Sequence, residues 1–244
     1  MVEQFGIEGI YIVHAKQGYQ YHADRINKLF KEKGLNFEFV TDGDPTCFTE
    51  DLLNKYFSED IRDILKDGII SCTLNHILSY ELIIKNNNKF ALVFENDPFF
   101  LGNFVKQIEK ITRDADKLEP GFIISLENTT LKFPETKKLQ KGKLLYPAAK
   151  GRCAGAYLID LKAAKDILED LKTTKCKQVI DWWHNTLIER NVVKMYWADP
   201  PLIEQGSHNG ILSSTISSEK RSMIRRIAWL AQKYYKTYIL RWFL

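Results

Sequence analysis

The sequence predicts an α/β protein in which helices flank a mainly parallel sheet, formed as one domain over residues 1–218. Short apolar segments alternate with segments of helical periodicity along the 244 residues. Residues 90–94 are apolar throughout, as in a strand that is buried on both faces of a parallel sheet. Hydrophobic residues make up 45% and charged residues 27% of the chain, a composition typical of globular proteins.

The first three expected elements are a strand, a helix and a second strand at residues 7–13, 22–33 and 37–40. Within the helix, Ile26, Leu29 and Phe30 recur at the spacing of one buried face, and Gly34 follows as a C-cap. The second strand ends in the turn-forming cluster Thr41-Asp42-Gly43-Asp44-Pro45.

The remaining elements continue the same alternation. Expected helices lie at residues 52–65 (in pieces), 71–86, 161–171 and 181–190. Expected strands lie at residues 90–94, 122–126, 156–159 and 192–197. No repeat, low-complexity stretch or linker rich in Pro, Gly or Ser interrupts them.

The net charge is concentrated at one end of the chain. Residues 219–244 hold seven basic groups and one acid, which gives +6 there and −2 for residues 1–218, against +4 in all. A nearly neutral body argues against nucleic-acid binding, which would need a basic patch on the fold itself.

The basic end is expected to be a second unit, an amphipathic helix. Six apolar or aromatic residues follow helical spacing there: Ile224, Ile227, Ala231, Tyr234, Tyr238 and Trp242. We favour a helix that contacts the anionic inner leaflet of a membrane peripherally. The alternative is a terminal helix that docks on the domain through its apolar side.

The cysteines and the N-terminus indicate a cytoplasmic protein. Cys47, Cys72, Cys153 and Cys176 are scattered without a Cys-x-x-Cys pair, which fits reduced thiols better than a disulfide framework. The first residues lack the basic and apolar regions of a signal peptide, and no segment approaches the roughly 20 apolar residues that span a bilayer.

The most informative motif is Glu95-Asn96-Asp97, directly after the apolar strand at residues 90–94. Ligands of open α/β sheets bind beyond the carboxyl ends of the strands. Two acids at such a strand end can share Mn²⁺ or Mg²⁺, which also binds substrate phosphates. The alternative is that Glu95 and Asp97 are solvated turn acids before Pro98.

Three other positions each allow two interpretations. His14 follows the first strand and is either a nucleotide contact or an ordinary loop histidine. Asp181 is either the N-cap of its helix or a general base, with Trp182 and Trp183 stacking on sugar rings. Cys72 and His76 share a helical face, but structural zinc needs four ligands, so a buried or capping histidine is favoured.

Several common phosphate-binding and nucleophile motifs are absent from the sequence. It contains no Walker or Rossmann glycine-rich loop and no Gly-x-Ser-x-Gly elbow. This weakens assignments as a kinase, a dehydrogenase or an α/β-hydrolase.

An ordered set of segments resembles glycosyltransferase family 25, the lipopolysaccharide-type sugar transferases that also include collagen galactosyltransferases. The resemblance covers roughly residues 7–216. The matching segments are residues 10–14 with Arg25-Ile26, then 39–43, 71–76 and 92–97, and last 155–159 with Ala164, Ile180-Asp181 and Pro200-Pro201-Leu202-Ile203.

The resemblance implies a GT-A fold, a UDP-linked hexose donor (galactose or glucose), a surface glycan or glycolipid acceptor, and inversion at the anomeric carbon. It implies that Glu95 and Asp97 hold a metal ion together with the donor diphosphate. The implied donor contacts are Val13, His14, Arg25, Asp42, Asn75, His76, Glu95 and Asn96. An inverting transfer needs one base, and the candidates are Asp181 and Glu204.

Some positions depart from the family pattern. Asn96 replaces the middle aspartate of the acidic motif, which removes one negative charge, and Ser71 and Asn75 replace a glycine and a serine. The substitution at Asn96 leaves a second hypothesis open, a non-catalytic sugar-nucleotide-binding scaffold of envelope glycan assembly.

Overall fold

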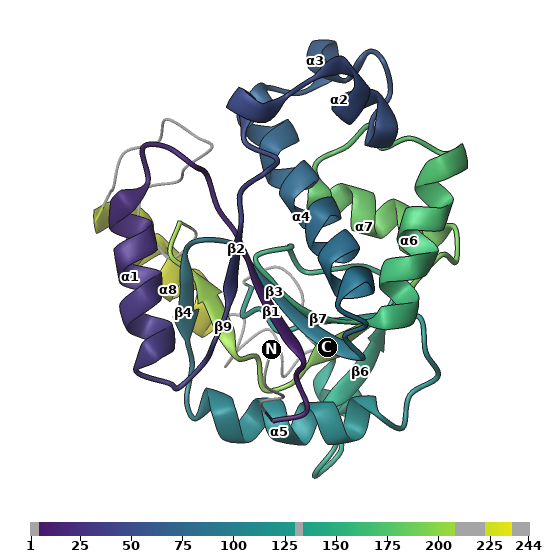
Figure 1. The fold of residues 1–244 in the computed structure, drawn as a ribbon. Helices are drawn as coiled ribbons and strands as arrows, with labels where there is room; N and C mark the ends of the chain where they lie inside the picture. Colours follow the sequence, from purple (N-terminus) through teal and green to yellow (C-terminus); the bar gives the residue numbers. More distant parts are fainter. Residues whose placement is uncertain (1–4, 130–133, 208–222, 236–244) are drawn as a thin grey trace.

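The computed structural model describes residues 5–129, 134–207 and 223–235. Its centre is a seven-stranded sheet with the strand order β2-β1-β3-β7-β5-β8-β6 (Figure 1). The strands are β1 (Gly9–Val13), β2 (Glu38–Val40), β3 (Phe90–Phe94), β5 (Phe122–Ser125), β6 (Leu145–Ala148), β7 (Ala156–Asp160) and β8 (Lys194–Ala198).

Most strands of this sheet point the same way, as the sequence predicts. Strands β1, β2 and β3 are mutually parallel, and β5 is parallel to β8. Strand β7 is antiparallel to both β3 and β5, and β6 is antiparallel to β8. Five strands therefore share one direction, and β6 and β7 run against them.

Helices cover both faces of the sheet (Figure 1). They are α1 (Gln20–Lys31), α2 (Glu50–Tyr56), α3 (Ile61–Ile64), α4 (Asp67–Lys85), α5 (Phe104–Ala115), α6 (Leu161–Thr173), α7 (Ile180–Glu189) and α8 (Met223–Tyr234), with short 3₁₀ helices η1 (Pro45–Cys47) and η2 (Thr136–Lys138). Helices α4, α6 and α7 pack in one apolar core, and α1 and α5 contribute to the other.

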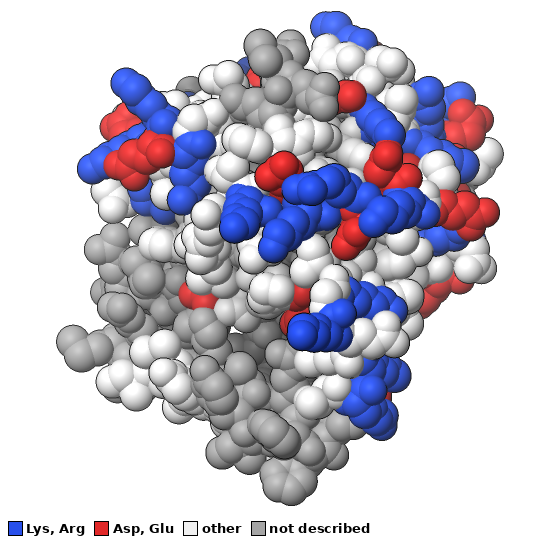
Figure 2. Space-filling view, turned by 90° about the horizontal axis from the view of Figure 1, so that it is seen from below, with Lys and Arg blue, Asp and Glu red and all other residues white. Residues whose placement is uncertain are grey.

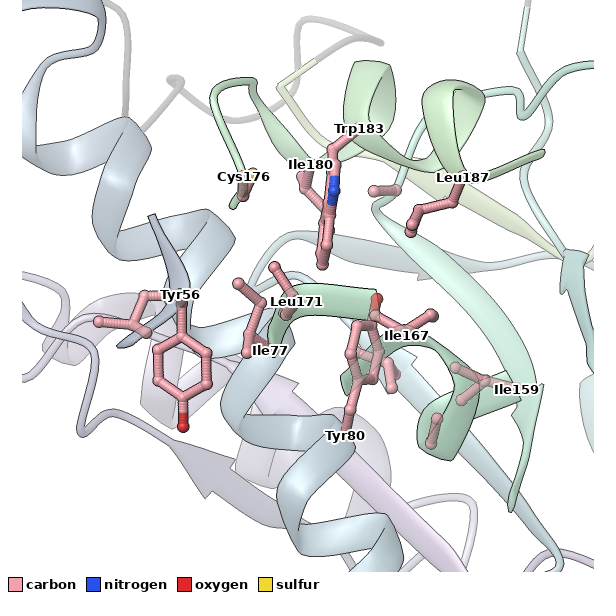
Figure 3. Close-up of a cluster of buried hydrophobic side chains, with 14 of the residues drawn as sticks. Tyr56, Ile77, Tyr80, Ile159, Ile167, Leu171, Cys176, Ile180, Trp183 and Leu187 are labelled. Carbon is pink, nitrogen blue, oxygen red and sulfur yellow. The ribbon is translucent and has the colours of Figure 1, made fainter. Parts of the chain in front are cut away.

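The core beneath α4, α6 and α7 is shown in Figure 3. Ile77 and Tyr80 come from α4, Ile167 and Leu171 from α6, and Trp183 from α7; all are buried. Trp183 is only 3% exposed. It therefore has no ring face free for stacking on a sugar, whereas Trp182 is 66% exposed.

Several elements differ from the sequence-based expectation. Helix α4 begins at Asp67, four residues before the expected start, and Gly68 lies in its first turn, where the sequence signal for a helix is weak. The expected elements did not include α5, β6, or the antiparallel pair β4 (Pro98–Phe100) and β9 (Ile203–Gln205).

The exposed face of α5 carries a row of basic side chains, visible in Figure 2 with acidic ones between them. Arg113 pairs with Glu109 at 3.1 Å, and Lys117 pairs with Asp114 at 2.8 Å. Such alternation of charge describes a solvated helix face, since neighbouring opposite charges offset each other.

The C-terminal segment is described only in part. In α8, Ile227, Leu230 and Tyr234 are exposed. Tyr238 and Trp242, which complete the expected apolar face, lie outside the described residues. Among the described residues no helix is both long and apolar enough to cross a membrane.

Candidate active site

The chain brings several polar segments to one edge of the central sheet. The carboxyl ends of β1, β3 and β5 meet there, because these strands point the same way, together with the amino end of the reversed strand β7. His14 follows β1, Glu95 follows β3, Glu127 lies just past β5, and Gly155 precedes β7. This edge is where open α/β sheets bind ligands.

A cavity of about 300 Å³ opens at this edge. Five of the predicted site residues line it: Val13, His14, Asn75, Glu95 and Asn96. The other lining residues are Ala15, Gln17, Tyr19, Asp44, Pro45, Thr46, Gly68, Ser71 and Cys72. The volume is at the lower end of the range of small-molecule sites.

His14 and Asn96 form the polar wall of the cavity beside β1. Asn96 Nδ2 lies 3.2 Å from His14 Nδ1, and the Asn96 carbonyl oxygen lies 3.3 Å from His22 Nδ1. Burial, with a smaller contribution from His22, lowers the pKa of His14 from 6.5 to about 4. His14 is therefore neutral at pH 7 and can accept a hydrogen bond from the Asn96 amide.

Asn75 links the loops that follow β1 and β2. Its Oδ1 accepts a hydrogen bond from the Gly43 amide at 2.8 Å, and its Nδ2 donates to the His14 carbonyl at 3.4 Å. A Cβ atom at Gly43 would lie 2.8 Å from Asn75 Oδ1, so this approach requires glycine. Asn75 therefore fixes the shape of the cavity wall.

Glu95 lies at the centre of a mixed group of ligand-type side chains. Its Oε1 is 3.8 Å from Cys72 Sγ and 3.7 Å from His76 Nε2, and its Oε2 accepts a hydrogen bond from Gln205 at 3.0 Å. Burial and the carboxylates of Glu95, Asp181 and Asp97 raise the pKa of Cys72 well above its usual value. The thiol therefore keeps its proton at neutral pH.

A buried chain of hydrogen bonds leads from this group into the core. His76 Nδ1 lies 2.8 Å from the Tyr157 hydroxyl, which lies 2.8 Å from the Tyr80 hydroxyl, and that hydroxyl lies 2.7 Å from His184 Nε2. Burial lowers the pKa of His76 and of His184 to about 3. Both imidazoles are therefore neutral, and each has one N–H donor and one lone pair.

The two carboxylate oxygens of Asp97 differ in their surroundings. Its Oδ2 accepts a hydrogen bond from the Ser207 amide at 2.8 Å, and its backbone carbonyl accepts one from Gly206. Its Oδ1 is buried and has no hydrogen-bond partner among the described residues. A buried carboxylate oxygen without a partner is costly, so the position fits a hard cation such as Mn²⁺ or Mg²⁺.

Arg25 and Asp42 lie outside the cavity lining. Both terminal nitrogens of Arg25 donate to the Pro98 carbonyl at 3.0 Å, and the guanidinium lies over the Phe99 ring. The Asp42 side chain is 86% exposed and pairs with Lys16 at 3.2 Å. Asp44, two residues further on, lines the cavity instead and caps η1 through Thr46.

The two candidate bases lie on different elements, Asp181 on α7 and Glu204 on β9. Asp181 is the second residue of α7, whose N-cap is Val179, so the N-cap interpretation of Asp181 is wrong. Its charge acts on Cys72, Cys153 and His76, which places it near the site. Glu204 lies on β9, is 8% exposed, and accepts a hydrogen bond from Asn128 at 2.7 Å.

Glu127 is a buried acid of this site that was not among the sequence-predicted residues. It is 2% exposed, and its Oε1 has no hydrogen-bond partner among the described residues. Burial, together with the charges of Glu95 and Asp97, raises its pKa well above the usual value. The signal that could have found it is the one that found Glu95, an acid directly after an apolar strand.

The fold and this strand-end site define a class of α/β proteins that bind a small ligand at the carboxyl edge of the sheet. Among known families, the model described as glycosyltransferase family 25 (LPS biosynthesis protein) matches residues 10–182. The chain therefore belongs to glycosyltransferase family 25. The match includes every sequence-predicted site residue except Glu204.

Two relatives come from Haemophilus influenzae. A protein of strain ATCC 51907 / DSM 11121 / KW20 / Rd named "Putative glycosyltransferase" is 27% identical over 194 residues, which is 74% of this chain and 67% of the relative. "Lipooligosaccharide biosynthesis protein lic2B" is 23% identical over 164 residues, 64% of this chain and 61% of the relative. The chain thus spans about two thirds of their length.

Proposed function

We propose that this protein is an inverting hexosyltransferase that moves galactose or glucose from a UDP-sugar to a lipopolysaccharide or another surface glycan. Membership of family 25 implies a sugar donor and a glycan acceptor. The observation that supports a metal-dependent reaction is the buried Oδ1 of Asp97, which has no hydrogen-bond partner in the described part of the chain; Asp97 lies two residues after the cavity-lining Glu95.

In this proposal Glu95 and Asp97 hold Mn²⁺ or Mg²⁺ together with the donor diphosphate. When bound, the cation neutralises the negative charge that develops on the departing nucleoside diphosphate. Gln205, which donates to Glu95, orients that carboxylate. Asn96 adds no charge to the motif, and its amide is engaged with His14.

The cavity supplies the donor-binding surface. Val13 and neutral His14 would contact the nucleotide, and Asn75 would hold the wall beside them. His76, Arg25 and Asp42 do not line the cavity, and we retain them as proposed donor contacts on the strength of the family resemblance. An amphipathic acceptor could use the exposed ring of Trp182 at the start of α7.

The base that deprotonates the acceptor is Asp181 or Glu204. The electrostatic influence of Asp181 on Cys72 and His76 supports the first, and the low exposure of Glu204 beside Asn128 supports the second. One carboxylate suffices for inversion, because the base acts once, on the face opposite the leaving group.

The first test is hydrolysis of a panel of nucleotide-sugars by the purified protein, with Mn²⁺ and with chelator. We expect metal-dependent release of UDP from one donor. Asp97→Ala should abolish it, while Asp63→Ala, which removes an exposed acid of α3, should not. Asp181→Asn or Glu204→Gln should lower turnover without loss of donor binding, and the variant that does so identifies the base.

The same assay distinguishes a transferase from a non-catalytic sugar-nucleotide-binding scaffold. Tight UDP-sugar binding without turnover, with or without a glycan acceptor, would favour the non-catalytic scaffold that Asn96 suggests. Neither binding nor turnover with any nucleotide-sugar would reject a donor site in this cavity.

We also propose that the protein works on the cytoplasmic side of the inner membrane, in peripheral contact with anionic lipid. The support is the seven basic groups of residues 219–244 and the exposed Ile227 and Tyr234 of α8. Co-sedimentation with anionic vesicles that weakens at high salt, and that is absent with neutral vesicles, is the expected result. Equal binding to both would contradict it.

A further inference from the structure

Three side chains, two of which line the cavity, have the composition of a zinc ligand set. Cys72 and His76 are four residues apart on α4 and so share one face of the helix, and Glu95 follows β3. Their ligand atoms all lie within 4.8 Å of one another. We propose that Cys72, His76 and Glu95 bind a borderline divalent cation of the zinc class, at a position separate from Asp97.

The distances suit such an ion. Cys72 Sγ and His76 Nε2 lie 3.8 Å and 3.7 Å from Glu95 Oε1. Around tetrahedral zinc, with bonds of roughly 2.0–2.3 Å, neighbouring ligand atoms are roughly 3.3–3.8 Å apart. The two separations from Glu95 therefore already fit such an ion, and the third, between Cys72 and His76, is within 4.8 Å.

His76 provides the independent observation. It is fully buried, and its Nε2 has no hydrogen-bond partner among the described residues. If the proton is on Nδ1, a lone pair on Nε2 faces the Glu95 carboxylate. If it is on Nε2, the 3.7 Å to Glu95 is too long for a hydrogen bond. A cation between the two groups satisfies both acceptors.

The surroundings of His76 match those of metal-binding histidines. Such residues donate their second N–H to a nearby acceptor, which fixes the tautomer. Here Nδ1–H can donate to Tyr157, Tyr157 to Tyr80, and Tyr80 to the lone pair on His184 Nε2, over 2.8, 2.8 and 2.7 Å. Every hydroxyl in this chain is then satisfied, and the Nε2 lone pair points at the ion.

The ion has a route in and a free coordination position. Cys72 and Glu95 line the cavity, so a cation can reach them from solvent and expose its fourth position to the same space. The Cys72 thiol, which now donates to Glu95, would release its proton to solvent as the metal–sulfur bond forms. Sulfur and nitrogen ligands favour zinc over Mg²⁺ or Mn²⁺.

The site shares Glu95 and His76 with the proposed donor site, so its test measures metal binding alone, in the absence of any nucleotide-sugar. Cobalt(II) serves as the probe, because thiolate coordination produces charge-transfer absorption in the near ultraviolet. Titration of the full-length, chelator-treated protein should reach one equivalent of cobalt, which zinc then displaces. Tyr157→Phe, which removes the partner of His76 Nδ1, should weaken cobalt binding by roughly 10- to 100-fold.

Variants separate this site from its neighbours. Cys72→Ser should abolish the charge-transfer band, whereas Cys153→Ser, a thiol near the same acids, and Asp97→Ala should retain it. Circular dichroism checks folding, and Cys72→Ala replaces Cys72→Ser if that variant does not fold. Absence of the band in the wild type, its persistence without Cys72, or its loss in Asp97→Ala would each overturn the proposal.

Discussion

Gly155 precedes β7, and two buried polar side chains of the site approach its backbone closely. A Cβ atom there would lie 2.2 Å from Gln205 Nε2 and 2.4 Å from Glu127 Oε1. Both neighbours are themselves buried, so neither can swing into solvent. Gln205 can therefore occupy its position and donate to Glu95 only because residue 155 has no side chain.

Gly155→Ala is expected to lower the free energy of unfolding by about 1–3 kcal/mol, because overpacking forces buried groups apart. It should also lower donor turnover by displacing Gln205 from Glu95. Urea unfolding and the donor assay measure the two effects. Gly151→Ala is the matched control: its nearest neighbour would be Met195 Cε at 3.5 Å, an ordinary contact. Equal losses in both variants would contradict this reading.

At this scale, the sequence located residues that directly follow apolar strands. His14 and Glu95 were found in this way, and both line the cavity. The partner of Glu95 was not predictable, because Gln205 reaches it from a distant part of the chain, and the same holds for Tyr157, the partner of His76. Asp42 was expected at the site, but its neighbour Asp44 lines the cavity, since turn geometry decides which acid points inward.

The two adjacent tryptophans of helix α7 lie in opposite environments, one buried and one exposed. Trp183 is 3% exposed and packs among the side chains of α4 and α6 (Figure 3). Trp182 is 66% exposed. The sequence pair Trp-Trp does not reveal which ring is inside. The packing of α7 against the core that it shares with α4 and α6 sets the rotation of the helix.

Trp183→Ala should therefore destabilise the protein by about 3–5 kcal/mol, the usual cost of removing a buried tryptophan. Trp182→Ala should change stability by no more than about 0.5 kcal/mol. Chemical denaturation followed by circular dichroism measures both. Similar values for the two variants would mean that α7 is rotated relative to the arrangement described here.

The strands that the sequence did not predict have a common cause. Strands β4, β6 and β9 are three or four residues long, and β4 and β6 contain a proline, which reads as a strand breaker. The sequence also does not indicate that β7 runs in the reverse direction, because a fully buried strand has the same apolar pattern in either orientation. Continuous apolar strands and most periodic helices were predictable because burial alone specifies them. Helix α5 is the exception: Phe104, Ile108 and Ile111 recur at helical spacing and are buried, yet this helix was not among the expected elements.

The whole molecule carries neutral histidines in its interior, and this makes its stability depend on pH. Burial lowers the pKa of His184 to about 3 and, with His22, that of His14 to about 4, from 6.5. At pH values between the lowered pKa of each histidine and 6.5, the unfolded chain binds more protons than the folded one. Stability therefore falls as pH falls below 6.5.

For His184 alone the expected loss is about 2 kcal/mol between pH 6.5 and pH 4.5. Urea unfolding at the two pH values, in the presence of chelator, measures the total effect. His184→Gln, which lacks the titrating group, should show a smaller difference between the two pH values than the wild type. An unchanged difference would mean that the pKa of His184 is the same in the folded and the unfolded protein.

The position of β7 has a consequence for how the chain is made. This strand bonds to β3 on one side and β5 on the other, so it alone joins the two halves of the sheet. Yet it begins at Ala156, about 60 residues after β3 ends at Phe94. At ribosomal rates of roughly 5–20 residues per second, the apolar edge of β3 waits several seconds for its partner. During that interval the nascent chain presents an unpaired strand to every neighbouring polypeptide, and its yield in the cell depends on what shields that edge.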